Sequence, residues 1–406
     1  MATSCTNDAS ICDSRLFNLQ AILQTAEGAL KSNLRTREIM TSPPTITSSS
    51  TVPAGLTKSY FPVVSGALNP ASPFLITGGT PKVLSGAIGV DAATMGPTGG
   101  NLGNGEQGTL WRIILNSDAT QISFLVQGYS IPYRFIVNGQ YVTAGTSSSS
   151  VGGNEYLTLT FANSQMREIA IESGLGYLFI ATYVGPTFSI WKPTTGKRVV
   201  FVGDSFTETT GATFAPNGYA RVAGDFLGVK DVVASGVGGT GYTNNASTKY
   251  TFLQRLQDWT TNDPDMVVFA GGINDANDAL LEPAVSVVLR ETRRILPAVP
   301  ILVLGAWSGS SGPSATIIGV ENKIKAAVTA INDPYIRFIP VSTDTRGAWI
   351  SGTGRVGAPN GTGNSDIYTS SDGIHPANEG HFYLGYRVAV SIYDTVFAMV
   401  KELVTT

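Results

Sequence analysis

Residues 199–212 read VVFVGDSFTETTGA, an apolar run that leads directly into Gly203, Asp204 and Ser205. A continuous apolar run of this length is typical of a strand buried on both faces, as in a parallel sheet. A serine at the end of such a strand either caps a helix or presents a reactive hydroxyl. The rest of the chain has to distinguish these two roles of Ser205.

Length and composition limit the classes of function. At 406 residues the chain is long enough for two or three domains, and 42% of its residues are apolar. Only 14% are charged and the net charge is −3 without a basic stripe, so we expect no nucleic-acid partner. No apolar run reaches the roughly 18 residues of a membrane span, and the first residues lack the pattern of a secretory signal, so cytoplasmic synthesis is expected. Cys5 and Cys12 do not have zinc-ligand spacing, and no metal is predicted.

Residues 1–55 are interpreted as a helix followed by a linker. Apolar periodicity predicts a helix over 13–40 with Asp13 or Ser14 as its N-cap. Its apolar stripe comprises Leu16, Leu19, Leu23, Ala26 and Leu30. The stripe fits a helix packed on its own chain as well as a short coiled coil or docking helix that would form a homo-oligomer. Residues 41–55, TSPPTITSSSTVPAG, have the Pro, Ser and Thr content of a linker.

Residues 56–192 have a β pattern. Segments at 111–115, 122–126, 156–160 and 169–171 alternate or run apolar between turn clusters. Asn138-Gly139 stands between two further apolar segments and is a strong hairpin signal, because both turn residues must tolerate a positive φ. Several short strands without a helical period between them predict a β-sandwich or jelly-roll domain over 56–192.

From residue 197 to 406 the pattern is that of a doubly wound, flavodoxin-like α/β domain. Apolar strands are predicted at 199–203, 231–234, 266–270, 300–304 and 336–340. Amphipathic helices separate these strands, which indicates a parallel sheet covered on both faces. In such sheets the ligand crevice lies outside the carboxyl ends of the strands, where Ser205 is found.

Only two histidines, His375 and His381, could serve Ser205 as a base. His381 shares its spacing with the apolar stripe of a C-terminal helix expected to start near Pro376, so we interpret it as a packed core residue. His375 stands just before that helix, three residues after Asp372. One short loop can therefore aim the imidazole outward while the Asp372 carboxylate binds its far nitrogen and stabilises the imidazolium. The alternative for Asp372 is a turn or helix-capping residue.

A tetrahedral intermediate also needs hydrogen-bond donors for its oxyanion. The glycine-rich segment 235–241 follows the second strand and can present backbone N–H groups, and Asn274 follows the third strand with a neutral amide donor. Residues 236–241 also spell the G-x-G-x-x-G pattern of dinucleotide sites. The polar segment that follows does not open an apolar-periodic helix, so the donor role is favoured over nucleotide binding.

Four ordered blocks together resemble those of the SGNH (GDSL) hydrolases, from about residue 197 to the C-terminus. The blocks are 203–205, a glycine of 235–241, 272–275 and 372–376. The resemblance implies an esterase with Ser205 as nucleophile, His375 as base and Asp372 as its orienting acid, and it implies no cofactor. The implied oxyanion donors are the N–H groups of Ser205 and Gly239 and the side chain of Asn274; Gly239 is preferred over Gly238 because it precedes the small polar Thr240. This chain departs from many relatives at Glu208, where they carry glycine or a small residue.

A β-sandwich followed by such a domain is similar to two-domain carbohydrate esterases that remove acetyl groups from polysaccharides. This likeness implies an acetylated glycan as the substrate and partner. The leading helix and linker also resemble parts of modular phage tail or virion proteins. Trp307, just past the fourth strand, is a candidate to stack on a sugar or a lipid chain, or else packs inside the domain. Alternatives are a short-chain lipase or thioesterase of the same fold and a non-catalytic virion or carbohydrate-binding protein.

Overall fold

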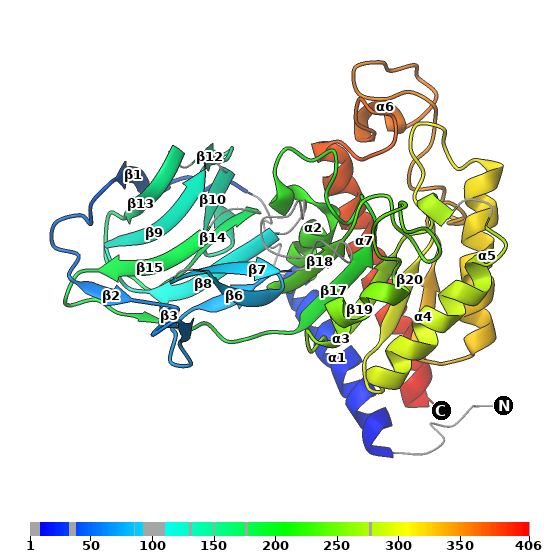
Figure 1. Ribbon diagram of the computed structural model, residues 1–406, viewed down its shortest axis with the longest axis horizontal. Coiled ribbons are helices and arrows are strands. Elements are labelled where there is room, and N and C mark those ends of the chain that lie inside the picture. Colours follow the sequence, from blue (N-terminus) through cyan, green and yellow to red (C-terminus); the bar gives the residue numbers. More distant parts are fainter. Residues whose placement is uncertain are drawn as a thin grey trace.

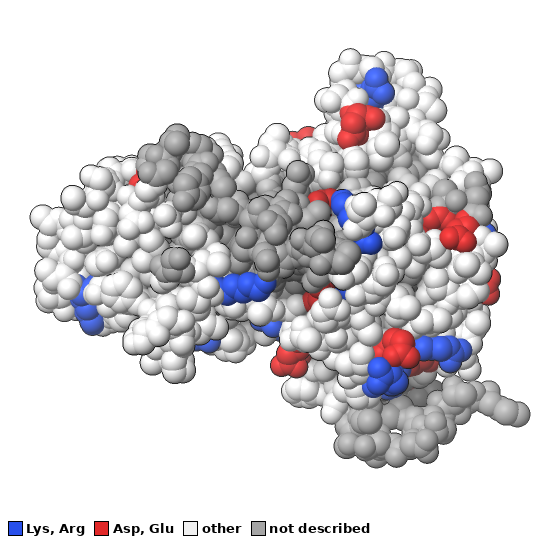
Figure 2. Space-filling model, viewed as in Figure 1, with Lys and Arg blue, Asp and Glu red and all other residues white. Residues whose placement is uncertain are grey.

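The computed structural model describes residues 9–31, 38–84, 86–91, 110–129, 132–148, 151–174, 178–275 and 278–405. Figure 1 shows a β-sandwich beside a parallel sheet that carries helices on both sides. The fold class predicted from the sequence is confirmed, whereas the residue numbers at which the domains divide stay a prediction. Figure 2 shows a face on which charged side chains are sparse and scattered, in keeping with a charged content of 14%.

The β-sandwich consists of two antiparallel sheets. One contains β1 (Thr45–Ser49), β2 (Lys58–Tyr60), β6 (Thr80–Leu84), β7 (Ala87–Asp91), β9 (Gln121–Tyr129), β13 (Val151–Thr160) and β15 (Leu178–Val184). The other contains β5 (Leu75–Thr77), β8 (Leu110–Ser117), β10 (Pro132–Val137), β11 (Gln140–Tyr141), β12 (Ser147–Ser148), β14 (Arg167–Gly174) and β16 (Ile190–Trp191). The short strands β3 (Val63–Val64) and β4 (Ala67–Leu68) form a separate hairpin.

The long strands β8, β9, β10, β13, β14 and β15 alternate between the two sheets in chain order, as in a jelly roll. Their inward-facing residues, such as Ile113 of one sheet and Phe124 of the other, are fully buried in a common core. The predicted hairpin is confirmed, since β10 and β11 pair across Asn138 and Gly139, whose φ angles are 50° and 82°. These positive angles belong to the tight turns that Asn-Gly favours.

The parallel sheet has the strand order β18-β17-β19-β20-β21, so the first strand in the chain lies second from the edge. Its strands are β17 (Arg198–Gly203), β18 (Asp231–Gly236), β19 (Met266–Ala270), β20 (Ile301–Leu304) and β21 (Ile336–Ile339). All five strands predicted for this region are confirmed. From β17 the chain adds β18 on one side and β19 on the other, so the direction in which strands are added reverses between β17 and β19. Ligands of doubly wound folds bind at this kind of switch point.

Helices cover both faces of the parallel sheet (Figure 1). On one face lie α1 (Ala9–Lys31), α2 (Tyr219–Phe226) and α7 (Asn378–Thr405); on the other lie α3 (Gln257–Thr260), α4 (Leu281–Ile295) and α5 (Ala315–Ile331). The remaining short helices are α6 (Ser365–Tyr368) and three 3₁₀ turns, η1 (Ala215–Asn217), η2 (Leu253–Arg255) and η3 (Ile273–Asp275). None of the helices in the described ranges is long and apolar enough to cross a membrane.

The N-terminal helix differs from its prediction at both ends. Its described part runs from Ala9 to Lys31, so Asp13 and Ser14 lie within it rather than at its cap. Ile39, predicted to be helical, instead makes a parallel bridge with Tyr141 of β11. Leu19, Ile22 and Ala26 are buried against α7, so the alternative of a helix packed on its own chain is the one observed.

The linker predicted over residues 41–55 is wrong in part. These residues contain β1, which pairs antiparallel with β13 from Thr45 to Ser49, because β-branched Thr and Ile residues favour a strand where a sheet edge is available. The C-terminal helix begins at Asn378, close to its predicted start near Pro376, which itself makes an isolated bridge with Thr369.

Candidate active site

Ser205 lies on the turn that follows β17, at the carboxyl edge of the parallel sheet. Gly203 makes this turn fit, because a Cβ atom there would lie 2.0 Å from the Thr207 hydroxyl oxygen and 2.5 Å from the Ala270 carbonyl oxygen. The turn is closed by the Glu208 N–H, which donates to the Asp204 carbonyl at 2.9 Å, and by the Thr210 N–H, which donates to the Ser205 carbonyl at 3.0 Å. The close approach of β19 therefore requires glycine immediately before Asp204 and Ser205.

The loop before α7 brings His375 to Ser205. The His375 Nε2 atom lies 2.8 Å from the Ser205 Oγ atom, and its Nδ1 atom lies 2.6 Å from the Asp372 Oδ2 atom. With the proton on Nδ1, the imidazole donates to Asp372 and leaves Nε2 as an acceptor for the serine hydroxyl. The structure thus places the three residues that sequence reasoning selected in one hydrogen-bonded row.

Asp372 is held by its own turn. Its Oδ1 atom accepts hydrogen bonds from the Ile374 N–H at 2.8 Å, the His375 N–H at 2.9 Å and the Ser370 hydroxyl at 2.8 Å. Partial burial opposes ionisation, but hydrogen bonds from Ile374, His375 and Ser370 hold the pKa of Asp372 well below its usual range. Asp372 is therefore an anion at neutral pH and can stabilise a positive charge on His375.

Contacts from two other loops hold the His375 turn in place. Gly373 has a φ of 78°, and its carbonyl accepts hydrogen bonds from the N–H and the hydroxyl of Ser310, each at 2.9 Å. On the other side, a Cβ atom at Gly211 would lie 2.3 Å from the Pro376 carbonyl oxygen and 3.2 Å from the His375 Cβ atom. The imidazole position therefore depends on close backbone packing that only glycine permits at residue 211.

The predicted oxyanion donors lie on three neighbouring loops. The backbone N–H groups of Ser205 and Gly239 have no hydrogen-bond partner within the described part of the chain. The Asn274 amide donates one hydrogen to the Thr240 carbonyl at 2.9 Å, which leaves its second hydrogen for another acceptor. The Glu208 carboxylate lies against Gly238, because a Cβ atom there would lie 2.3 Å from its Oε2 atom, so Gly239 is the better candidate of the two glycines.

Asp275 joins two loops of the candidate site, a contact that sequence reasoning did not assign. It is 2% exposed, and its carboxylate accepts hydrogen bonds from the backbone N–H groups of Tyr242, Thr243 and Asn244 at 2.8–3.0 Å. These bonds tie the loop after β18 to the loop after β19, so the glycine segment and Asn274 are held together. The Asn-Asp pair after the third strand was the only signal of this role in the sequence.

Asp204, next to Ser205 in the chain, is fully buried. Its Oδ1 atom accepts the Phe206 N–H at 3.0 Å, while its Oδ2 atom has no hydrogen-bond partner among the described residues. Burial raises the pKa of Asp204 to about 7, and the hydrogen bond from Phe206 offsets only part of this effect. At neutral pH this carboxyl group is therefore partly protonated beside Ser205.

Trp307 does not lie on the surface of the site. Its side chain is 1% exposed and stacks on Phe206 with ring centres 5.6 Å apart and an angle of 5° between the planes. Phe206 in turn lies 5.6 Å from the His375 ring. Burial of Trp307 agrees with packing inside the domain rather than with stacking on a sugar. His381 is fully buried too: its Nδ1 atom accepts the Tyr219 N–H at 3.2 Å.

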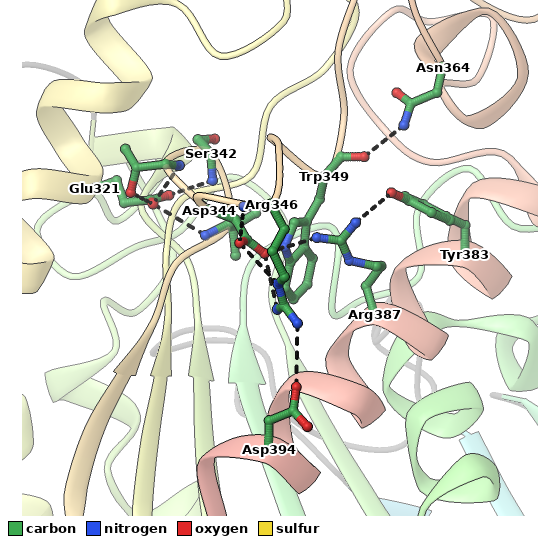
Figure 3. Close-up of polar contacts among 11 residues, drawn as sticks. Glu321, Ser342, Asp344, Arg346, Trp349, Asn364, Tyr383, Arg387 and Asp394 are labelled. Carbon is green, nitrogen blue, oxygen red and sulfur yellow. Dashed lines mark hydrogen bonds and ion pairs between the residues drawn. The ribbon is translucent and has the colours of Figure 1, made fainter. Parts of the chain in front are cut away.

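The segment between β21 and the His375 turn is tied to the domain by a polar network (Figure 3). The buried Glu321 carboxylate of α5 accepts the N–H groups of Ser342 at 2.8 Å and Thr343 at 2.9 Å. Asp344 accepts the Trp349 indole N–H at 2.9 Å and the Arg387 guanidinium of α7 at 2.9 Å. Residues 343–371 are thus anchored at their start to helices on both faces of the sheet.

The C-terminal part of the chain also matches a known family in sequence. Residues 201–382 match the family model described as the GDSL-like Lipase/Acylhydrolase family. We refer to the part of the chain that matches this model as the GDSL-like domain. The GDSL-like domain includes Ser205, Gly239, Asn274, Asp372 and His375. A search of curated proteins gave no match.

Several solved structures share the two-part fold. The salicylyl-acyltransferase SsfX3 from a tetracycline biosynthetic pathway superimposes with a TM-score of 0.63 at 13% identity, covering 83% of this chain and 97% of the other. A family two carbohydrate esterase from Cellvibrio japonicus gives 0.57 at 12% identity, covering 88% and 99%. The acetyl xylan esterase Est2A from Butyrivibrio proteoclasticus gives 0.53 at 13% identity, covering 84% and 99%. The likeness extends over the sandwich as well as the GDSL-like domain, and the comparisons lend no support to a phage association.

Proposed function

We propose that the protein is a serine esterase that hydrolyses carboxylic esters through an acyl-enzyme. The observation that carries this proposal is the 2.8 Å approach of the His375 Nε2 atom to the Ser205 Oγ atom, in line with Asp372. Nucleophile, base and orienting acid within hydrogen-bond reach are what acyl transfer by a serine requires. The match of residues 201–382 to a lipase and acylhydrolase family supports the same reaction class.

In the first half-reaction, His375 takes the Ser205 proton while the serine oxygen attacks the ester carbonyl. The oxyanion accepts hydrogen bonds from the N–H groups of Ser205 and Gly239 and from the Asn274 amide. His375 then gives its proton to the leaving alcohol, and the acyl group stays on Ser205. In the second half-reaction a water molecule, deprotonated by His375, releases the acid and restores the serine.

We further propose an acetylated glycan as the substrate. The support is the shared two-part fold of structures whose titles name a family two carbohydrate esterase and an acetyl xylan esterase. The small number of charges on the chain, 14% of residues, also suits an uncharged polymer better than a highly charged one. A short-chain lipase or thioesterase activity is the alternative within the same chemistry.

Hydrolysis of p-nitrophenyl acetate tests the reaction class. The wild-type protein should turn the ester over, and Ser205→Ala should fall to the background rate, because no other hydroxyl faces His375 in the described residues. Ser164→Ala, an exposed serine of the sandwich, is the matched control and should keep full activity. An inactive wild type, or a Ser205→Ala variant that keeps turnover, would show that the protein is not this esterase.

The substrate class is tested separately. Acetate release from acetylated xylan should be measured beside hydrolysis of p-nitrophenyl acetate and p-nitrophenyl octanoate. We expect acetate release and a kcat/KM for the acetyl ester at least about tenfold above that for the octanoyl ester, a ratio that a pocket sized for a short acyl chain can supply. A higher kcat/KM for the octanoyl ester would indicate a lipid substrate instead of a glycan, and the proposed esterase reaction would still hold.

A further inference from the structure

Glu208 and Lys249 flank Gly238, yet neither belongs to the acyl-transfer residues described above. Glu208 is 7% exposed, and its carboxylate faces the Gly238 N–H, so that a Cβ atom on Gly238 would lie 2.3 Å from the Oε2 atom. The Lys249 ammonium donates to the Gly238 carbonyl at 2.7 Å. Both polar groups of this one glycine are therefore met by charged side chains of opposite sign.

The carbonyl that Lys249 binds belongs to the same peptide unit as the Gly239 N–H. None of the described peptide bonds is cis. In a trans peptide unit the C=O and the N–H point in opposite directions from one rigid plane. A contact that fixes the Gly238 carbonyl therefore also fixes the direction in which the Gly239 N–H points. Ser205 lies near the same glycine pair, with its Cβ atom 3.5 Å from the Cβ position of Gly238.

Nothing in the two glycines themselves holds this plane. Rotation of a peptide plane changes ψ of the residue before it and φ of the residue after it, and glycine permits both signs of φ. Gly239 has a φ of 78°, a value that glycine can exchange for a negative one without steric cost. Asp275 binds the N–H groups of residues 242–244, which lie further along the loop. The Thr240 N–H and hydroxyl both donate to the Val237 carbonyl, at 3.3 and 2.7 Å, and close a turn around the glycine pair. Turns closed in this way occur with the central peptide plane in either of two directions, so the Lys249 contact with the Gly238 carbonyl selects the direction observed.

Glu208 stabilises Lys249 in this position. Burial raises the pKa of the Glu208 carboxyl, while the Lys249 ammonium and the Gly238 N–H oppose this effect by stabilising the anion. Glu208 is buried and Lys249 half-buried on either side of Gly238, so the two opposite charges offset part of the cost of removing them from water.

We propose that Lys249, supported by Glu208, is a positioning residue that orients the Gly238–Gly239 peptide so that the Gly239 N–H faces the oxyanion. The inference rests on the proposed esterase function. The ammonium also polarises the peptide unit that it binds, which strengthens the Gly239 N–H as a donor. Both effects act on the developing charge of the transition state and not on the bound substrate.

The test compares Lys249→Met, which keeps the length of the side chain without its charge, with Lys249→Arg, which keeps a cationic donor. Lys249→Met should lower kcat for p-nitrophenyl acetate by about 10- to 100-fold with KM within twofold, a loss somewhat below that of deleting an oxyanion donor. Lys249→Arg should recover kcat to within about fivefold of wild type. Lys58→Met is the matched control, because the Lys58 ammonium also donates to a backbone carbonyl, that of Phe188 at 3.1 Å, but within the sandwich.

The results separate this inference from the function on which it rests. A wild type without turnover refutes the esterase, whereas an active wild type with an equally active, folded Lys249→Met variant refutes the role of Lys249 alone. Equal losses in Lys249→Met and Lys249→Arg, accompanied by a lower melting temperature, would show a merely structural lysine and also refute it. If Lys249→Met does not fold, Lys249→Gln replaces it: a fall in kcat of about tenfold at constant KM supports the role, and wild-type kcat refutes it.

Discussion

The buried carboxyl groups around Ser205 differ in the number of hydrogen-bond donors that the protein offers them. Asp275 receives three backbone N–H groups and the Thr243 hydroxyl, so its charge is dispersed over four donors. Asp204 receives only the Phe206 N–H, and its Oδ2 atom is unpartnered in the described structure. A buried carboxylate with one donor favours its neutral form, because burial penalises the charge and a single hydrogen bond does not compensate.

This difference predicts a pH-dependent stability that belongs to Asp204. Burial raises its pKa to about 7, above the value of about 3.9 in an unfolded chain, so the folded protein binds a proton that the unfolded chain releases between these values. The contribution to stability is therefore complete below about pH 4 and is lost as the pH rises through about 7. Asp204→Asn has no proton to lose and should be increasingly more stable than wild type toward pH 8.

Urea unfolding of wild type and Asp204→Asn at pH 5 and pH 8 measures this effect. The free energy of unfolding of the variant relative to wild type should increase from the lower to the higher pH, by at most about 4 kcal/mol. Taking the difference between the two proteins removes the contributions of other carboxylates such as Asp372, whose lowered pKa acts in the opposite sense at acid pH. A difference that is the same at both pH values would contradict a raised pKa at Asp204.

At the scale of elements, the parallel sheet positions the site because β17, β18 and β19 all end at one edge. Ser205, the glycine segment and Asn274 follow these three neighbouring strands, so parallel pairing alone brings their loops together. The His375 turn reaches the same edge only through the segment after β21. That segment has no strand partner over most of its length, and side chains of α5 and α7 anchor its start (Figure 3).

Glu321 of α5 is the anchor whose removal is most informative. Its fully buried carboxylate accepts the N–H groups of Val341, Ser342 and Thr343 and the Thr343 hydroxyl. Glu321→Gln replaces one acceptor oxygen by an NH₂ group that faces N–H donors, which should cost about 2–4 kcal/mol of unfolding free energy. Trypsin should also cleave faster after the exposed Arg355, which lies in the anchored segment.

The control for Glu321→Gln is Glu291→Gln, at an exposed ion pair with Arg294. That change should alter the unfolding free energy by less than about 0.5 kcal/mol, since exposed ion pairs contribute little. If Glu321→Gln and Glu291→Gln have the same stability and the same tryptic rate, the carboxylate does not anchor the segment.

At the scale of the whole molecule, the chain begins on the GDSL-like side, crosses to the sandwich and returns. The apolar face of α1 is buried with α2 and α7, although the strands of the sandwich separate it from them in sequence (Figure 1). Polar contacts join the two parts directly: Arg112 of β8 pairs with Glu172 inside the sandwich and with Asp225 of α2 at 3.1 Å. Removing one partner of a buried ion pair leaves the other charge unpaired, which costs folding free energy. This network therefore favours one arrangement of the sandwich relative to the GDSL-like domain.

The docking of α1 predicts that its apolar face contributes to the stability of the GDSL-like domain. Ile22 is 1% exposed, so Ile22→Ala should lower the free energy of unfolding by about 2–4 kcal/mol through loss of packing. Phe17 is 65% exposed on the same helix, and Phe17→Ala should have an effect below about 1 kcal/mol. Thermal unfolding compares the two variants; equal melting temperatures would mean that α1 does not pack on the domain in solution.

The sequence by itself determined the five parallel strands, the Asn-Gly hairpin and the choice of Ser205, Asp372 and His375. These features are local: strand periodicity, turn chemistry and residue types at strand ends can each be recognised within a few residues. The scarcity of histidine helped as well, because only two residues could act as the base. The resemblance of four ordered blocks added the assignment of Gly239 and Asn274 as donors.

Only the tertiary structure decided the features that depend on contacts between distant segments. Trp307 packs inside the domain, β1 extends a sheet where the sequence predicts a linker, and Asp275 joins two loops. The pairing of Glu208 and Lys249 across one glycine likewise has no local signature. The physical reason is that burial, hydrogen-bond partners and the direction of a peptide plane are set by neighbours in space, which the order of residues along the chain does not reveal.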